Sequence, residues 1–145
     1  IKGIDEAAGG IAESTGFLVG SVEESSSATL ELGATIEEIA GQFNLTIGTF
    51  GHAGDGNLHP TILTDRRNHE EWVRVEKAID AIFDRALALG GTLSGEHGIG
   101  MAKSRFLEKE TSRATILYSR RIKSALDPKN ILNPGKIIGE VSWPT

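Results

Sequence analysis

The segment 50-FGHAGDGNLHP-60 carries two of the chain's four histidines, His52 and His59, on either side of a Gly-Asp-Gly sequence. An Asp-Gly pair between two strand-like runs predicts a two-residue hairpin turn, here at Asp55 and Gly56. In that register His52 lies directly opposite His59, and such residues share a face with Cβ atoms about 4.5–5.5 Å apart. Two imidazoles so placed can bind one divalent metal at about 2.0–2.1 Å. The segment therefore predicts a pair of metal ligands.

A plainer interpretation of the same segment is two solvated or hydrogen-bonded histidines at the mouth of a loop. A longer loop with a different register would break the direct pairing of His52 with His59. Asp55 is interpreted as a turn former rather than a ligand, because Asp-Gly is a common turn sequence.

A second polar cluster, 95-GEHGIG-100, places Glu96 and His97 between glycines that allow a close approach of the backbone. Two histidines and a carboxylate form a ligand set that leaves coordination positions open, which suits catalysis better than structure. Adjacent residues on an extended chain point in opposite directions, so we expect only one of Glu96 and His97 to bind the metal. The other is then available as an acid or base, and spacing alone does not assign the two roles.

The elements that position these clusters can be read from hydrophobic spacing. Residues 45–52 and 57–63 are predicted to form the two strands of a hairpin. A helix follows, with Asn68 and Glu71 as its capping pair and Gly90-Gly91 as its end. Its apolar face comprises Trp72, Val75, Ile79, Ile82, Phe83 and Ala86.

The region before the hairpin is less regular. Residues 16–22 predict a short buried strand because their apolar residues are nearly continuous, and residues 23–28 predict a polar loop. Residues 29–44 have helical spacing, and residues 1–15 are too weakly patterned for an assignment.

The region after the second cluster contains a short amphipathic segment at Phe106 and Leu107, then a predicted helix over residues 111–126. Asp127-Pro128 ends that helix, and residues 130–138 are predicted to be extended. Because strands alternate with helices, we expect an α+β fold with helices packed on one sheet.

Composition excludes several function classes. The net charge of −5 disfavours binding to nucleic acid or to an anionic membrane. The absence of cysteine excludes disulfides, thiolate metal sites and cysteine nucleophiles. The length of 145 residues fits one domain, and a start at Ile1 rather than Met suggests part of a longer protein. With no long apolar run or signal-peptide pattern, we expect a cytoplasmic protein.

Three segments then carry a resemblance to a known family: 48-GTFGHAGDGNLHPTI-62, 94-SGEHGIGMAK-103 and 126-LDPKNILNPGK-136. They resemble the C-terminal domain of FAD-linked 2-hydroxyacid oxidases and dehydrogenases, which include the flavoprotein subunit of glycolate oxidase, D-lactate dehydrogenase and D-2-hydroxyglutarate dehydrogenase. The resemblance covers about residues 43–138. Upstream, relatives commonly have a Val-Pro-Arg-Ser-like segment where this chain has 23-EESSSATL-30.

The resemblance implies roles for individual residues. His52, His59 and Glu96 would bind a divalent metal, namely Zn, Mn or Fe, and His97 would be the base that takes the substrate's hydroxyl proton. Thr61 would face the substrate. Residues nearer the flavin would be Asn133 and Lys136.

The resemblance also implies a ferredoxin-like domain with a largely antiparallel sheet and a C-terminal helical segment. All 145 residues would form the substrate and metal domain, and FAD would be held mainly by a domain that this chain lacks. Residues 1–145 alone would then neither retain FAD nor turn over a 2-hydroxyacid. Partners would be that domain and other oxidase subunits, with a position at the inner face of the membrane as an alternative location.

Two other functions fit parts of the pattern. A non-haem Fe(II) oxygenase also uses two histidines and a carboxylate, although its sites lie on β-rich folds. A non-catalytic module that docks partner subunits would leave the metal motifs empty.

Overall fold

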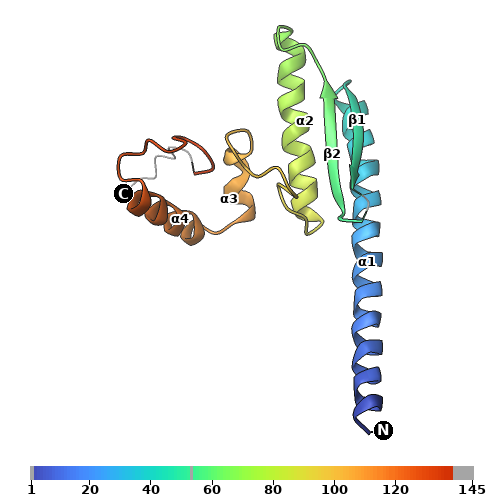
Figure 1. Ribbon diagram of the computed structural model, residues 1–145. Coiled ribbons are helices and arrows are strands. Elements are labelled where there is room, and N and C mark those ends of the chain that lie inside the picture. Colours follow the sequence, from blue (N-terminus) through green and yellow to red (C-terminus); the bar gives the residue numbers. More distant parts are fainter. Residues whose placement is uncertain (1, 53, 139–145) are drawn as a thin grey trace. The chain divides into compact units, whose positions relative to one another are not determined.

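The computed structural model describes residues 2–52 and 54–138, which cluster into two compact units (Figure 1). The first unit extends to Ile82 and the second begins at Phe83. The elements, in chain order, are α1 (Lys2–Gln42), β1 (Thr46–His52), β2 (Asn57–Leu63), α2 (His69–Ala88), the 3-10 helix η1 (Ser104–Phe106), α3 (Leu107–Glu110) and α4 (Arg113–Leu126). The α2 helix begins in the first unit and ends in the second. The α+β class predicted from the sequence is confirmed.

The first unit is built around an antiparallel pair of strands, β1 and β2. One face of this pair is covered by the C-terminal half of α1 and by α2. The buried residues of this core are Ile36, Ile39, Ala78 and Ile82, and the strands contribute the partly buried Ile47, Leu58 and Ile62. Each fully buried Ile or Leu contributes about 1.5–3 kcal/mol relative to exposure. The helices therefore lie on one face of the sheet, as expected, and leave the other face open to carry functional side chains.

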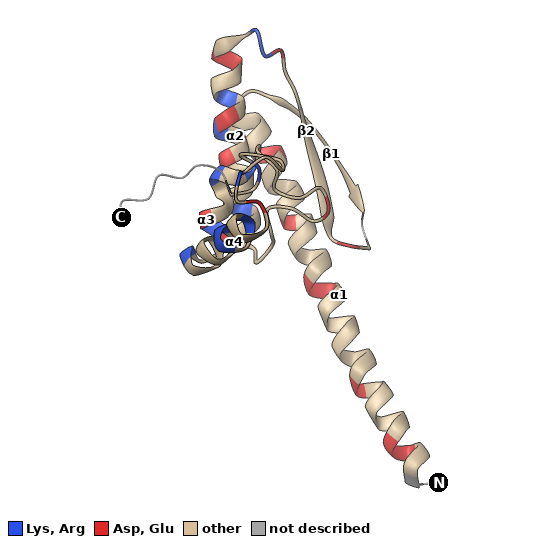
Figure 2. Ribbon diagram, turned by 60° about the vertical axis from the view of Figure 1, so that its left-hand side comes forward, with Lys and Arg blue, Asp and Glu red and all other residues tan. Residues whose placement is uncertain are grey.

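The α1 helix corrects the upstream predictions. The predicted strand at residues 16–22 and the predicted loop at residues 23–28 both lie inside this continuous helix. Phe17 and Leu18 stay largely exposed, so the apolar run that suggested a buried strand is not buried. Figure 2 shows acidic residues along α1, in which Lys2 is the only basic residue.

Threonine hydroxyl groups along α1 are bonded within the helix. The Thr15, Thr29 and Thr35 hydroxyls each donate to the carbonyl four residues earlier, at 2.8–2.9 Å. Ser and Thr usually disfavour helices because their side chains compete for backbone groups, and here that bonding is accommodated within the helix. Composition alone did not reveal this.

The predicted ends of α2 are confirmed. The Glu71 N–H donates to Asn68 Oδ1 at 3.2 Å, and Asn68 Nδ2 donates to Glu71 Oε2 at 3.2 Å. At the other end Gly90 has φ +77°, and the Gly91 N–H donates to the Ala86 carbonyl at 2.9 Å. A positive φ after the last turn is the usual way for a helix to end at glycine.

The second unit contains the end of α2 and the short elements that follow. Phe106, 2% exposed, packs against Phe83 with ring centroids 4.6 Å apart. The α4 helix begins after Ser112, whose Oγ accepts from the Thr115 N–H at 3.1 Å. Its Ile116 is buried, whereas Leu117, Ile122 and Leu126 of the same helix are exposed.

The segment after α4 differs from its prediction. Residues 130–138 form turns and bends rather than an extended tail. Asn130, Asn133 and Gly135 have positive φ, a conformation that Asn and Gly tolerate better than other residues. No helix among the described residues is both long enough and apolar enough to cross a membrane.

Candidate metal and catalytic site

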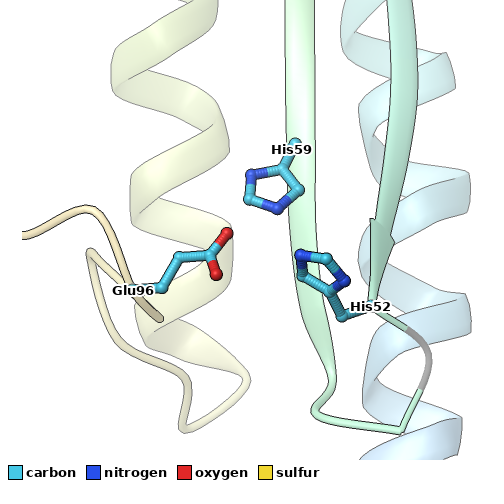
Figure 3. Close-up of side chains that lie close together, drawn as sticks. All are labelled: His52, His59 and Glu96. Atoms are coloured by element: carbon cyan, nitrogen blue, oxygen red, sulfur yellow. The ribbon is translucent and has the colours of Figure 1, made fainter.

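The two histidines lie together on the open face of the hairpin (Figure 3). Their ring centroids are 5.3 Å apart and the ring planes meet at 89°. His52 is exposed and His59 is half-buried. Two imidazoles at this separation, on adjacent strands, are a suitable pair of nitrogen donors.

The register that produces this pair is not the predicted one. His52 pairs with Asn57 and His59 pairs with Phe50, so the loop contains four residues, 53–56, rather than two. His52 is therefore a diagonal neighbour of His59. Because side chains alternate with a period of two, a displacement by two residues keeps both histidines on the same face. The predicted direct pairing was wrong, but the predicted proximity is present.

The turn itself explains the longer loop. The Asp55 N–H donates to the His52 carbonyl at 3.0 Å, and Gly56 has φ +63°. Asp-Gly therefore supplies the second half of a four-residue loop, a length that hairpins also use commonly.

Neighbouring residues shape this face of the hairpin. The Phe50 ring lies beside His59 with centroids 5.4 Å apart and the planes tilted by 34°. Thr61, the predicted substrate contact, is exposed on the same face two residues beyond His59. Gly51 lies on the opposite face, where a Cβ atom would come within 2.0 Å of the Asn57 carbonyl oxygen. Only glycine allows the two strands to approach so closely beside His52.

Glu96 and His97 come from the loop after α2, in the second unit, and Figure 3 shows Glu96 on that loop. His97 Nε2 lies 3.3 Å from Glu96 Oε1. The expectation that these side chains point in opposite directions was wrong, because the loop bends instead of running extended. Gly98 and Gly100, with φ +75° and +55°, produce part of that bend.

The residues predicted to lie near the flavin have other contacts here. Lys136 Nζ donates to Met101 Sδ at 2.9 Å, and the next residue, Ile137, donates its N–H to the Gly100 carbonyl at 2.7 Å. Asn133 occupies a left-handed turn with φ +46°. The 133–137 segment is thereby fastened to the end of the loop that carries Glu96 and His97.

The sequence interpretation overlooked two carboxylates in the second unit. Asp127, buried, accepts the N–H groups of Ile131 at 3.0 Å and Leu132 at 2.8 Å, as well as the Lys123 ammonium. The Lys123 hydrogen bond is the main cause of a lowered Asp127 pKa, although burial opposes it. Its position between a helix end and Pro128 was the available signal. The other overlooked carboxylate, Glu110, had no comparable signal, because it lies in a run of charged residues.

Known proteins are similar to this chain. Residues 25–137 match the family described as FAD linked oxidases, C-terminal domain. The chain belongs to this family. The match to the FAD-linked oxidases includes the hairpin, the loop after α2 and the turns after α4, and it extends farther upstream than the resemblance seen in the motifs.

Individual relatives agree with this assignment to the FAD-linked oxidases. The chain is 50% identical over 105 residues to glycolate oxidase subunit GlcD of Bacillus subtilis (strain 168), covering 72% of this chain and 22% of that protein. It is 41% identical over 95 residues to probable mitochondrial D-lactate dehydrogenase of Danio rerio, covering 66% and 19%. It is also 41% identical over 101 residues to D-lactate dehydrogenase of Archaeoglobus fulgidus, covering 70% and 22%. The chain spans about a fifth of the length of these relatives.

Proposed function

We propose that the protein containing this chain oxidises a 2-hydroxyacid of the glycolate or D-lactate type to the 2-oxoacid. Support comes from the family match and from relatives named glycolate oxidase subunit and D-lactate dehydrogenase. The observation that carries the proposal is the histidine pair, with 5.3 Å between ring centroids, on the open face of the hairpin. FAD, when bound, accepts the hydrogen and two electrons that leave the substrate's α-carbon.

In this proposal, His52, His59 and Glu96 hold a divalent metal ion. The hairpin fits this role because it presents two imidazoles from adjacent strands on an accessible face, with Phe50 packed beside one ring. A carboxylate added to two histidines gives a donor set that suits Zn, Mn or Fe and leaves positions for substrate oxygens. Such an ion supplies Lewis acidity to the substrate's hydroxyl group.

His97 is the base in this proposal. One of its ring nitrogens takes the proton of the substrate hydroxyl while the α-hydrogen leaves with its electron pair, so the C–O bond becomes a carbonyl. Glu96 Oε1, 3.3 Å from His97 Nε2, can accept a hydrogen bond from the protonated ring. Imidazole suits this role because its unperturbed pKa lies near neutral pH.

Three further residues complete the proposed site. Thr61 shares the open face with the histidines, so its hydroxyl can donate to a substrate carboxylate. Asn133 and Lys136 would contribute to holding the flavin, and most flavin contacts would come from a domain outside this chain. The matched region makes up only 22% of the Bacillus subtilis relative, which leaves room for such a domain there.

The test uses the full-length flavoprotein that contains this chain, with His59→Ala as the variant. We expect the variant to lose its metal and most of its activity toward glycolate and D-lactate while its flavin absorbance persists. The loss should exceed the roughly 10–100-fold effect of removing an outer-shell partner of a metal. The control is Leu63→Ala, an exposed residue on the same face of β2, which should keep metal and activity. Unchanged metal content and activity in His59→Ala would refute the assignment.

A further inference from the structure

Glu110, the last residue of α3, contacts the loop that carries Glu96 and His97. Its Oε1 accepts the Thr92 hydroxyl, and its Oε2 accepts the Leu93 N–H at 3.3 Å. We propose that Glu110 is a positioning residue that sets the location of Glu96 and His97 by holding the first residues of their loop. This inference rests on the proposed function, because it assumes that these two residues act in the site.

The α3 helix gives Glu110 a fixed base. Phe106, directly before this helix, packs against Phe83 of α2. Lys109 Nζ lies 2.5 Å from Asp84 Oδ1, which joins α3 to the same end of α2. One apolar and one ionic contact thus fasten α3 to α2, and the Glu110 carboxylate extends from it toward Thr92.

The contact with Glu110 matters because part of the loop borders a cavity rather than packed side chains. A cavity of about 490 Å³ lies between the loop and the α3 and α4 helices. Its wall on the loop side includes Thr92, Ser94 and Ile99, and Glu110 lies on the helix side. Ser94 Oγ is buried and finds no hydrogen-bond partner among the described residues, so it adds no such tether. At the start of the loop, the Glu110 bonds therefore act together with the packing of Leu93, which is buried.

The two bonds to Glu110 hold orientation as well as position. The Oε1 bond engages the Thr92 side chain and the Oε2 bond engages the Leu93 backbone, so these two residues are fixed together. Glu96 follows Leu93 by three residues, which is at most about 10 Å of chain. A displacement at Leu93 is therefore carried directly to Glu96 and His97. In well-organised sites, a misplacement of about 1 Å can lower the rate about 100-fold.

A carboxylate suits this arrangement because it presents two acceptor oxygens, one for the Thr92 O–H and one for the Leu93 N–H. Glu110→Met keeps a side chain of similar length and removes both acceptors. Thr92→Val removes only the hydroxyl that donates to Glu110, and Thr92→Ser retains it.

The experiment uses the full-length flavoprotein and measures kcat, KM, the affinity for Mn²⁺ alone by calorimetry, and the melting temperature. We expect Glu110→Met and Thr92→Val each to lower kcat and Mn²⁺ affinity about 10–100-fold, in the range for groups that orient metal ligands. The double variant should lose little more than Glu110→Met alone, because Thr92→Val removes a bond that Glu110→Met has already removed. Thr92→Ser should stay close to the wild type.

The matched control is Glu108→Gln, which changes an exposed carboxylate two residues earlier in the same helix and leaves both Glu110 bonds in place. It should keep kcat and Mn²⁺ affinity near wild-type values. Equal catalytic losses in Glu108→Gln and Glu110→Met, or no loss in Glu110→Met, would overturn the positioning role. If His59→Ala leaves metal content and activity unchanged, the proposed function itself fails.

Discussion

The hairpin and the loop after α2 both carry proposed site residues, but they hold them in different ways. His52 and His59 are held by the backbone ladder of two seven-residue strands, backed by helices on the other face. Glu96 and His97 lie in a loop whose ends are tied by Glu110 and by Ile137. The hairpin therefore positions side chains by a repeating backbone pattern, and the loop positions them by a few individual contacts.

This difference determines how each region responds to a displacement or a substitution. A displacement of the hairpin register by two residues leaves both histidines on one face, because the pleat repeats every two residues. The loop has no such repeat. If the Glu110 or the Ile137 bond is lost, no alternative register restores the positions of Glu96 and His97. Substitutions in the hairpin should mainly affect folding stability, and substitutions at the loop tethers should mainly affect the site.

The largest effect should come from Gly51→Ala, which tests the hairpin side of the comparison. The new Cβ would lie 2.0 Å from the Asn57 carbonyl oxygen, so the strands must separate beside His52. We expect a loss in the free energy of unfolding near the upper end of about 1–3 kcal/mol, measured by urea denaturation of the chain. Gly48→Ala in the same strand has open space around it and is the control. Equal losses in the two variants would contradict this account of the strand contact.

A smaller effect is expected for Gly98→Ala, which tests the loop. Gly98 has φ +75° and no neighbour within 4 Å of a new Cβ, so the cost is conformational rather than steric. We expect about 1 kcal/mol of destabilisation in the same denaturation assay. Gly98→Asn should cost less, because Asn adopts positive φ more readily than Ala. If Asn and Ala destabilise the protein equally, backbone strain at this position is not the cause.

The smallest effect should be the pH dependence associated with Asp127, which holds the turns after α4. The Lys123 ammonium, followed by the Leu132 and Ile131 N–H groups, lowers the Asp127 pKa below its unfolded value near 3.8. A lowered folded-state pKa stabilises the protein fully above the unfolded pKa, and the contribution is lost as pH falls through the folded pKa. The melting temperature of Asp127→Asn should therefore lie below the wild-type value at pH 7, with a difference that narrows below about pH 4. A difference that stays constant down to pH 3 would exclude this linkage.

The sequence predicted the local features that depend on neighbouring residues. The strands at residues 45–52 and 57–63 and the capping of α2 by Asn68 were confirmed within a residue or two. Such features follow from short-range spacing and from the chemistry of helix ends. Residues 29–44 were predicted to be helical, and α1 confirms this up to Gln42. Residues 16–28 of the same helix were mispredicted because Gly, Ser and apolar residues there satisfy several local patterns equally well.

The amino-acid sequence by itself determined which residues share a face of the hairpin and which family the chain belongs to, because alternation and motif order are properties of the chain. Only the tertiary structure decided that His52 is a diagonal rather than a direct neighbour of His59. It also decided that Glu110 holds the loop at Thr92 and Leu93. The physical reason is that loop length and contacts between residues 17 or 18 positions apart depend on how the helices pack. No local pattern encodes that packing.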